Sequence, residues 1–262
     1  MQGIAFHKYE GLGNDFVLVE AEREDAVTAA QARSICDRRF GVGADGVLLL
    51  LPPRTKGAAG TMRVINADGS VPEMCGNGLR CVALHHARSH AKASAEATFD
   101  TDAGPKPCSF DGALVSVDMG VVKVGYDVMI DVDGDPWRFT IADAGNPHAI
   151  TTQPADRAIV DRVGPFVATA PEFPSGTNVE FAAKRDGEID LVVWERGVGV
   201  THACGTGACA TAAAFVAKGL LEVDTEVKIN LPGGSLYVKV RPDAHAMMRG
   251  PARHVFSGTL SP

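Results

Sequence analysis

Two cysteines occur in the same short motif, once in each half of the chain. The first motif is Met74-Cys75-Gly76-Asn77-Gly78, and the second is Ala203-Cys204-Gly205-Thr206-Gly207. Each is followed by a run of residues that is typical of a helix. The two cysteines lie 129 positions apart in a chain of 262 residues, which is close to half its length. The repeat predicts that each cysteine begins a helix in one half of a duplicated protein.

A cysteine at the start of a helix suits proton-transfer chemistry. The unpaired N–H groups and the partial positive charge of a helix N-terminus lower the pKa of a thiol there. The glycines allow a ligand to approach the backbone, and the same N–H groups can hold a carboxylate. Two such cysteines could remove a proton from one face of an α-carbon and return one to the other. A single motif would indicate only a cysteine packed beside a tight turn; the second copy favours chemistry.

Composition limits the class of protein. Apolar residues make up 45% of the chain and charged residues 22%, which is ordinary for a soluble globular protein. The net charge of −7 argues against a basic surface for nucleic acid or anionic membranes. No apolar run approaches the roughly 18 to 20 residues of a membrane span, and the N-terminus lacks a signal-peptide pattern. We expect a cytoplasmic protein with no nucleic-acid or membrane partner.

The six cysteines do not form a disulfide framework or a recognisable zinc motif. They are too sparse for a small stapled scaffold. The pairs Cys75/Cys81 and Cys204/Cys209 enclose five and four residues without the paired Cys or His ligands of a zinc site. We therefore expect no metal, and we expect Cys81 and Cys209 to be buried core thiols.

Hydrophobic patterning predicts alternating strands and a few helices in both halves. The expected helices cover residues 28–40, 76–88, 156–163 and 208–218. The expected strands are 4–9, 16–20, 47–51, 62–65, 114–118, 137–142, 176–181, 189–195, 226–230, 235–240 and 255–257. Residues 89–112 are weakly patterned, and the first domain boundary is placed after them.

Other short segments repeat with the cysteines. Asn14 precedes Asn146 by 132 positions, Asp45 precedes Asn178 by 133, and Asn66 precedes Glu195 by 129. A nearly constant offset is hard to obtain by chance. The sequence therefore predicts an α+β fold of two pseudo-symmetric, similarly built domains, with the active site in the cleft between them. The domains expected are 1–113, to which 252–262 return, and 114–251.

Several polar residues could support the cysteines. His148 follows Asn146 in a turn and could set the protonation of one thiol, although a lone histidine in a turn is usually a surface residue. Arg196 could bind a second carboxylate of the substrate, or could form a solvated ion pair with Glu195. The four asparagines Asn14, Asn66, Asn146 and Asn178 all lie in turns, where asparagine is common for backbone reasons. His85, His86 and His202 receive no role.

Taken together, these segments resemble the diaminopimelate epimerases. Residues 66–70 followed by 75–80 are similar to that family's signature around its first catalytic cysteine. Shorter segments that match other blocks of the family are 11–16, 40–46, 145–148, 177–181 and 195–210. The matches run in order and cover most of the chain.

The resemblance implies a fold, an activity and a set of residues. The fold is two domains in which a mixed sheet wraps around a central helix, and the last ten or so residues return to the first domain. The activity is cofactor-independent interconversion of LL- and meso-diaminopimelate for lysine and cell-wall synthesis, in a cytoplasmic homodimer. Cys75 and Cys204 would be the acid and base, tuned by His148 and Glu195. The residues implied to bind substrate are Asn66, Asn178 and Arg196 at the distal end, and Gly76, Asn77, Gly205 and Thr206 at the reacting carboxylate, with Asn14 and Asn146 as further candidates.

The chain departs from the family pattern in three places. Val200 replaces the glutamate that the family usually has before its second cysteine motif, and Gly46 replaces a glutamine of some members. Residues 89–112 match poorly. Two alternatives stay open: a racemase of another amino acid on the same fold, which Val200 favours, and a redox-sensing or ligand-binding protein whose thiols transfer no proton.

Overall fold

The computed structural model describes residues 3–91, 95–112 and 114–260. The chain divides into two compact units: Met1–Val117 with Gly250–Pro262, and Asp118–Arg249. These divisions lie close to the expected boundaries at 113/114 and 251/252. No helix in the described residues is long and apolar enough to cross a membrane.

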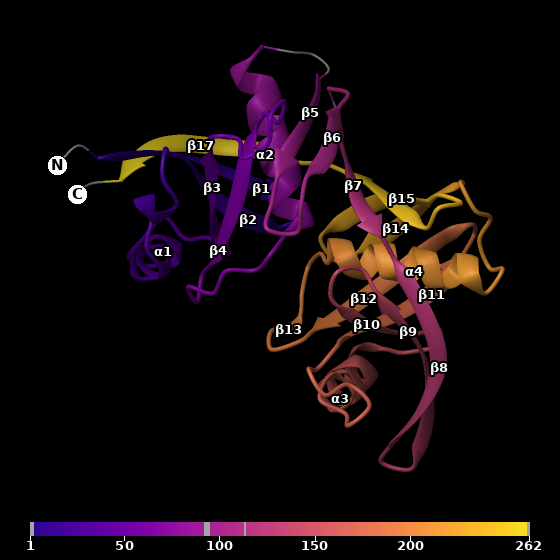
Figure 1. The fold of residues 1–262 in the computed structure, drawn as a ribbon. Helices are drawn as coiled ribbons and strands as arrows, with labels where there is room; N and C mark the ends of the chain where they lie inside the picture. Colours follow the sequence, from indigo (N-terminus) through magenta and orange to yellow (C-terminus); the bar gives the residue numbers. More distant parts are fainter. Residues whose placement is uncertain (1–2, 92–94, 113, 261–262) are drawn as a thin grey trace. The chain divides into compact units, whose positions relative to one another are not determined.

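The first unit is built on one mixed sheet (Figure 1). In spatial order its strands are β17 (Arg253–Leu260), β1 (Ile4–Gly11), β2 (Asn14–Glu20), β3 (Gly46–Leu51), β4 (Gly60–Asn66), β5 (Ala95–Asp100), β6 (Lys106–Phe110) and the start of β7 (Val115–Val121). The β2–β3 and β4–β5 pairs are parallel, and the other pairs are antiparallel.

The second unit has a sheet of the same kind. In spatial order its strands are β8 (Lys123–Val132), β9 (Asp135–Asp143), β10 (Pro147–Thr151), β11 (Asn178–Arg185), β12 (Glu188–Glu195), β14 (Glu226–Leu231), β15 (Gly234–Val240) and β16 (His245–Gly250). A two-residue strand, β13 (Gly199–Val200), pairs with the end of β12. Here β10–β11 and β12–β14 are the parallel pairs.

The two sheets repeat the same series of parallel and antiparallel pairs, so the predicted duplication is confirmed. The repeats exchange one strand. β8 follows β7 in the chain but pairs with β9 of the second unit, whereas β17 follows β16 and pairs with β1 of the first. β8 is therefore the edge strand of the second unit's sheet, although it directly follows β7, the last strand of the first. β17 is the edge strand of the first unit's sheet, although it directly follows β16, the last strand of the second.

One long helix packs against each sheet, as expected. α2 (Gly76–Ser89) contacts β1, β6 and β17, and α4 (Gly205–Ala217) contacts β15 and β8 to β11 (Figure 1). The two helices pack differently. α4 is buried through its run of alanines, whereas α2 buries Arg80, whose Nε donates to the carbonyl of Pro251 at 3.1 Å. Both helices begin at their motif cysteine, so the sheet fixes where each cysteine lies.

The two shorter helices correct the predicted boundaries. α1 (Ala29–Cys36) starts at a capping box formed by Thr28 and Gln31 but ends four residues before the expected Phe40. It ends there because the Asp37 carboxylate accepts hydrogen bonds from the backbone N–H groups of Arg39 and Phe40, which turns the chain. A one-turn 3-10 helix, Glu24–Ala26, precedes α1.

α3 (Arg157–Ala168) continues five residues beyond the expected end at Val163. It runs through Pro165, because Val167 and Ala168 are buried in the core of the second unit and hold the last turn in place. The helix is capped by Asp156, whose side chain accepts from the N–H of Ile159 at 2.9 Å.

Six strands were missed from the sequence. Two of them are the two-residue β13 and β10, which contains His148, where a turn was expected. β5 and β6 form a hairpin within the weakly patterned segment 89–112. β8 was missed because most of its side chains are exposed and give no apolar alternation, and β16 because its buried residues include a glycine and an alanine. Expected residues that fall on 92–94 and 113 lie outside the described residues.

Candidate active site

Cys204 is the N-cap of α4, the position that its motif predicted. Its backbone is extended, with φ −126° and ψ 105°, and its Sγ accepts a hydrogen bond from the N–H of Gly207 at 3.4 Å. The Thr206 hydroxyl lies 3.5 Å from the same sulfur. Only 6% of Cys204 is exposed, so its sulfur is held at a helix N-terminus and shielded from solvent.

Cys75 has the same arrangement at the start of α2. It is the N-cap, with φ −138° and ψ 112°, and its Sγ accepts from the N–H of Gly78 at 3.4 Å. Cys75 is half-buried, whereas Cys204 is buried. The predicted equivalence of the two cysteines is confirmed within each unit.

Glu195 lies beside Cys204. It is the last residue of β12, and a side-chain hydrogen bond joins it to the cysteine. The Thr201 hydroxyl donates to its Oε1 at 2.5 Å. Burial raises the pKa of Glu195, and the nearby Glu180 adds to that effect. The protonated form of this carboxyl is therefore favoured more than in water.

His148 is fully buried in β10 and is held from both sides. Its Nδ1 lies 2.6 Å from Oε1 of Glu180, and its Nε2 lies 2.9 Å from Oδ1 of Asn146. The predicted proximity of His148 and Asn146 is confirmed. Because oxygen atoms flank both nitrogens, the ring cannot rotate without losing a hydrogen bond.

Glu180 was missed by the sequence analysis. It lies in β11, is fully buried, and its Oε2 has no hydrogen-bond partner among the described residues. Its Oε1 is so close to the first turn of α4 that a Cβ added to Gly207 would lie 2.8 Å from it. A signal was present in the sequence: Asn178 and Glu180 alternate with Val179 and Phe181, which predicts one polar and one apolar face.

The carboxyl groups and the cysteine influence one another's protonation. The pKa of Cys204 is raised well above its usual value, first by burial and then by the nearby Glu195 and Glu180. Hydrogen bonds from Thr206 and from the N–H of Gly207 act in the opposite direction but do not cancel it. In the free protein Cys204 is therefore a thiol.

The strand positions that hold the acid–base groups beside Cys204 carry other residues in the first unit. Phe16 pairs with Gly46 between β2 and β3 as His148 pairs with Asn178 between β10 and β11. The counterparts of Asn178 and Glu180 are thus Gly46 and Leu48, and the alignment of Asp45 with Asn178 was wrong by one residue. A Cβ on Gly78 would lie 2.8 Å from Leu48 Cδ2, in the place that Glu180 takes beside Gly207.

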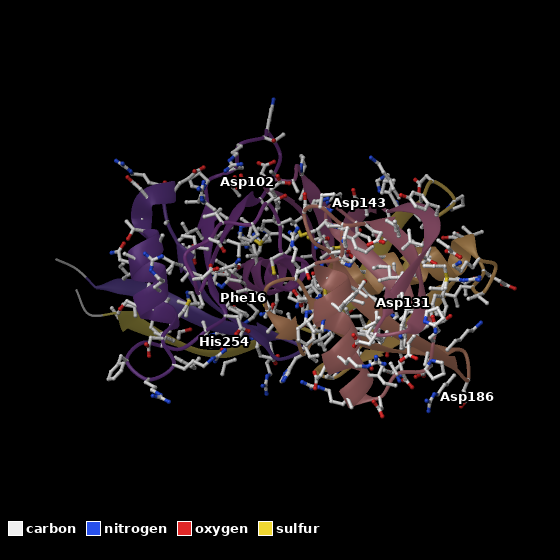
Figure 2. The ribbon with its side chains drawn as sticks, turned by 90° about the horizontal axis from the view of Figure 1, so that it is seen from below. Phe16, Asp102, Asp131, Asp143, Asp186 and His254 are labelled. Atoms are coloured by element: carbon white, nitrogen blue, oxygen red, sulfur yellow. The ribbon has the colours of Figure 1, made fainter. Side chains whose placement is uncertain are left out.

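The counterpart of His148 in the first unit is also apolar. Phe16 is buried and is labelled in Figure 2. Asn66, which pairs with Gly46, takes the place that Glu195 takes in the second unit. At these equivalent positions the ionisable side chains therefore belong to the second unit, which carries Cys204.

Polar residues in the first unit form a separate network at the start of α2. The Asn14 amide donates to Asp45 at 2.8 Å, and its Oδ1 accepts from the Asn77 amide at 3.1 Å. Asn66 donates to the Ser70 hydroxyl at 2.9 Å. Asn14 and Asn77 are thus brought together, and Asn77 with Gly76 forms the buried first turn of the helix.

In the second unit the structure brings Asn178 and Arg196 together. The backbone N–H of Arg196 donates to Asn178 Oδ1 at 2.9 Å. The Arg196 guanidinium bonds to the carbonyl of Ser175. Gly205 and Thr206 are the first two residues of α4 and present their N–H groups beside Cys204.

The two departures at Val200 and Gly46 have structural explanations. Val200 pairs with Trp194 through β13 and packs against the apolar core of the second unit. The adjacent Thr201 instead supplies the polar contact to Glu195. At Gly46 a Cβ would lie 2.9 Å from the carbonyl oxygen of Ile65, so this position has no room for a glutamine side chain without a shift of the backbone.

The cysteines outside the two motif positions behave as expected. Cys81 and Cys209 are fully buried, and burial raises the pKa of the Cys81 thiol far above its usual range. Cys36 and Cys108 are also buried thiols with pKa values raised by burial, to about 11 and about 12. Cys75 is the one cysteine of the described residues that is half-buried.

The difference in environment predicts different reactivity of Cys75 and Cys204. We expect iodoacetamide at pH 7 to alkylate Cys75 at least about tenfold faster, since each unit of pKa changes the thiolate fraction about tenfold. Glu195→Gln removes a negative charge from beside Cys204, which lowers the pKa of that thiol and speeds its alkylation. Peptide mass spectrometry measures both rates, and Glu188→Gln, at an exposed carboxylate on the same strand, is the control. Equal rates at the two cysteines would contradict the asymmetry.

Comparisons with known proteins agree with this picture. The family model for diaminopimelate epimerase matches residues 6–124 and 140–255. The chain is 41% identical to the diaminopimelate epimerase of Synechococcus elongatus over 98% of each chain. It is likewise 41% identical to that of Carboxydothermus hydrogenoformans, over 97% of this chain and 98% of the relative.

Among solved structures the fold is shared more widely than the sequence. A probable proline racemase from Agrobacterium radiobacter has a TM-score of 0.77 at 18% identity, covering 98% of this chain and 93% of that one. A hydroxyproline epimerase from Agrobacterium vitis has a TM-score of 0.76 at 17% identity, covering 99% and 94%. The full-length sequence matches and the family model together assign the chain: it belongs to the diaminopimelate epimerase family.

Proposed function

We propose that Cys75 and Cys204 form an acid–base pair that inverts one α-carbon of LL-diaminopimelate to give meso-diaminopimelate. As a member of its family the chain is an isomerase, specifically a diaminopimelate epimerase in lysine biosynthesis. The observation that carries the two-base mechanism is the repeated cap: each cysteine sulfur accepts a hydrogen bond from the N–H of the third residue of its helix. The reaction needs only groups that the protein itself supplies.

In this mechanism the two cysteines act on opposite faces of one carbon. Cys75, as thiolate, takes the α-proton of the LL-isomer, and the C–H electron pair passes to the carboxylate as an enediolate. The Cys204 thiol then donates its proton to the other face, which leaves a Cys75 thiol and a Cys204 thiolate. The assignment of the resting thiol to Cys204 rests on its raised pKa. In the reverse direction the roles exchange.

The helix N-termini bind the reacting carboxylate. The N–H groups of Gly76 and Asn77, and those of Gly205 and Thr206, lie in the first turns beside the two sulfurs. Such N–H groups attract an anion, and the negative charge that develops on the carboxylate strengthens the interaction in the transition state. This stabilisation is what makes the weakly acidic α-proton removable.

Asn66, Asn178 and Arg196 bind the distal amino acid group of the substrate. Arg196 offers five N–H donors, so it can keep its bond to Ser175 and still bind a carboxylate. Asn14 and Asn146 hold the loops next to Asn77 and His148. A substrate with a second amino acid group at its far end uses these contacts, which a short aliphatic amino acid cannot.

His148, Glu195 and Glu180 set the protonation of Cys204. The two ring nitrogens of His148 face oxygen atoms of Glu180 and Asn146, which fix the orientation of the ring. Glu195 contacts Cys204 directly. Glu180 lies against His148 and Gly207 and acts on the Cys204 sulfur through these neighbours. It is therefore a positioning residue.

We also propose a cellular location and an oligomeric state for the enzyme. We place it in the cytoplasm, as a homodimer that binds no nucleic acid. The net charge of −7 supports the last point, and the biosynthetic role of the family supports the first. The homodimer is what the resemblance to the family implies.

Deuterium incorporation tests the two-base mechanism. In D2O the wild type should convert LL-diaminopimelate to the meso isomer with deuterium at the inverted α-carbon. Cys75→Ala and Cys204→Ala should each lower the rate of inversion by at least about a thousandfold, because each removes one of two required proton carriers. Cys36→Ala, at a buried thiol outside the motifs, is the matched control. Mass spectrometry with chiral separation measures both products. No exchange by the wild type would refute the activity, and exchange retained in both alanine variants would refute the mechanism.

The role of Glu180 makes a separate prediction. Glu180→Gln should lower kcat about 10- to 100-fold with little change in KM, since it disturbs His148 rather than a substrate contact. Glu180 raises the pKa of Cys204, so its loss lowers that pKa. The high-pH limb of kcat/KM should therefore move to lower pH.

Asp190→Asn, at an exposed carboxylate on neighbouring β12, should leave the pH profile unchanged. A purely structural defect in Glu180→Gln would lower the rate equally at all pH values. A profile that keeps its shape would therefore contradict a role for Glu180 in tuning Cys204.

A further inference from the structure

Two histidines and a carboxylate converge in the first unit at a point that the epimerase chemistry does not use. His7 of β1, Glu20 at the end of β2 and His85 of α2 each place one ligand atom within 4.8 Å of the other two. His85 is ten residues along α2 from Cys75, about 15 Å at the helical rise of 1.5 Å per residue. The cluster is thus separate from the cysteine motif on the same helix.

Strand register explains why these side chains meet. His7 pairs with Leu18, so Glu20, two residues further along β2, points to the same face of the sheet. On the other side of β1, Ser257 pairs with His7, and His254 pairs with Tyr9. His254 is labelled in Figure 2 on β17. α2 covers β1 and β17, which brings His85 onto these residues.

Each histidine of the cluster has one nitrogen already fixed by a neighbour. His85 Nδ1 lies 3.1 Å from the Tyr9 hydroxyl, and His7 Nδ1 lies 2.8 Å from the Ser257 hydroxyl. A metal-binding histidine typically has this arrangement, with one nitrogen hydrogen-bonded to orient the ring and the other directed to the ion.

The other nitrogen of His85 already faces an anionic ligand. His85 Nε2 lies 3.0 Å from Oε1 of Glu20, whose side chain is 63% exposed. A cation can replace the proton shared by this pair.

We propose that His7, Glu20 and His85 form a binding site for a divalent late first-row transition ion, with Zn²⁺ as the favoured occupant. Two imidazoles and one carboxylate, with water as a fourth ligand, make a known zinc ligand set. Mg²⁺ and Ca²⁺ prefer oxygen ligands and are poor candidates. A pocket of about 450 Å³, lined by Glu20, Glu22 and His85 among others, gives the ion access from solvent.

A bound ion would connect β1, β2 and α2 through their side chains. Because only the folded unit brings the three ligands together, the ion raises the midpoint of thermal unfolding. It takes no part in proton transfer, so removal of the metal leaves epimerisation unchanged.

The test uses the full-length, untagged and metal-stripped protein with Co²⁺ as a spectroscopic probe. We expect one equivalent of Co²⁺ to bind, with d–d absorption and without a thiolate-to-cobalt charge-transfer band. Glu20→Gln and His85→Ala should lower the affinity at least tenfold, and Tyr9→Phe about tenfold through loss of the orienting contact. His90→Ala, at an exposed histidine at the end of α2, is the matched control and should bind as the wild type does.

Two results would overturn the proposal. One is binding that shows the sulfur band and disappears in a Cys75→Ser/Cys204→Ser variant, which would place the ion at the active-site thiols. The other is wild-type affinity in Glu20→Gln, whose exposed side chain makes this variant informative even if His85→Ala does not fold. Addition of Zn²⁺ should raise the melting temperature of the wild type and of His90→Ala but not of Glu20→Gln.

Discussion

The structure depends on one interaction that occurs twice, a cysteine sulfur that accepts a hydrogen bond from the first turn of the helix it caps. This contact fixes the sulfur beside the first-turn N–H groups that can hold a carboxylate. It also explains the glycine three positions on. At Gly78 a Cβ would meet Leu48, and at Gly207 it would meet Glu180, each at 2.8 Å. Any larger residue at either position would require the side chain of Leu48 or Glu180 to move.

Duplication supplies two equivalent caps, and a few substitutions make them different. The sheets share one series of strand pairings, so each position near Cys204 has a counterpart near Cys75. In the second unit those positions hold His148, Glu180 and Glu195, whereas the first has Phe16, Leu48 and Asn66. Burial raises the pKa of Cys204, the nearby Glu195 and Glu180 add to that effect, and the sulfur stays a thiol. A pair of proton carriers benefits from such a difference, because one must begin as base and the other as acid.

Much of this arrangement could be predicted from the sequence because it is encoded locally. The Cys-Gly-X-Gly motifs, the helices after them and the neighbouring Asn146 and His148 all follow from short segments. Features that depend on partners distant in the sequence were missed. Glu180 is a charged residue in a strand, and only its pairing with β10 shows that it is buried against a histidine.

Other predictions from the sequence were wrong or incomplete for related reasons. β8 carries mostly exposed side chains, and its position is set by pairing with β9 rather than by its own hydrophobic pattern. α1 ended early because the Asp37 side chain competes for backbone N–H groups, an effect that apolar periodicity does not reveal. The correspondence of Asn178 with Gly46 required the strand register, because nearly constant offsets cannot distinguish adjacent residues.

The central claim is that Cys75 and Cys204 serve one substrate carbon, and oxidative crosslinking tests it most directly. A disulfide requires the two Cα atoms to come within about 7 Å of each other. Mild oxidation should produce a single Cys75–Cys204 crosslink, seen in the peptide mass spectrum, and reduction should restore lost epimerase activity in parallel. Full activity after oxidation with no reducible crosslink between these residues would contradict the claim.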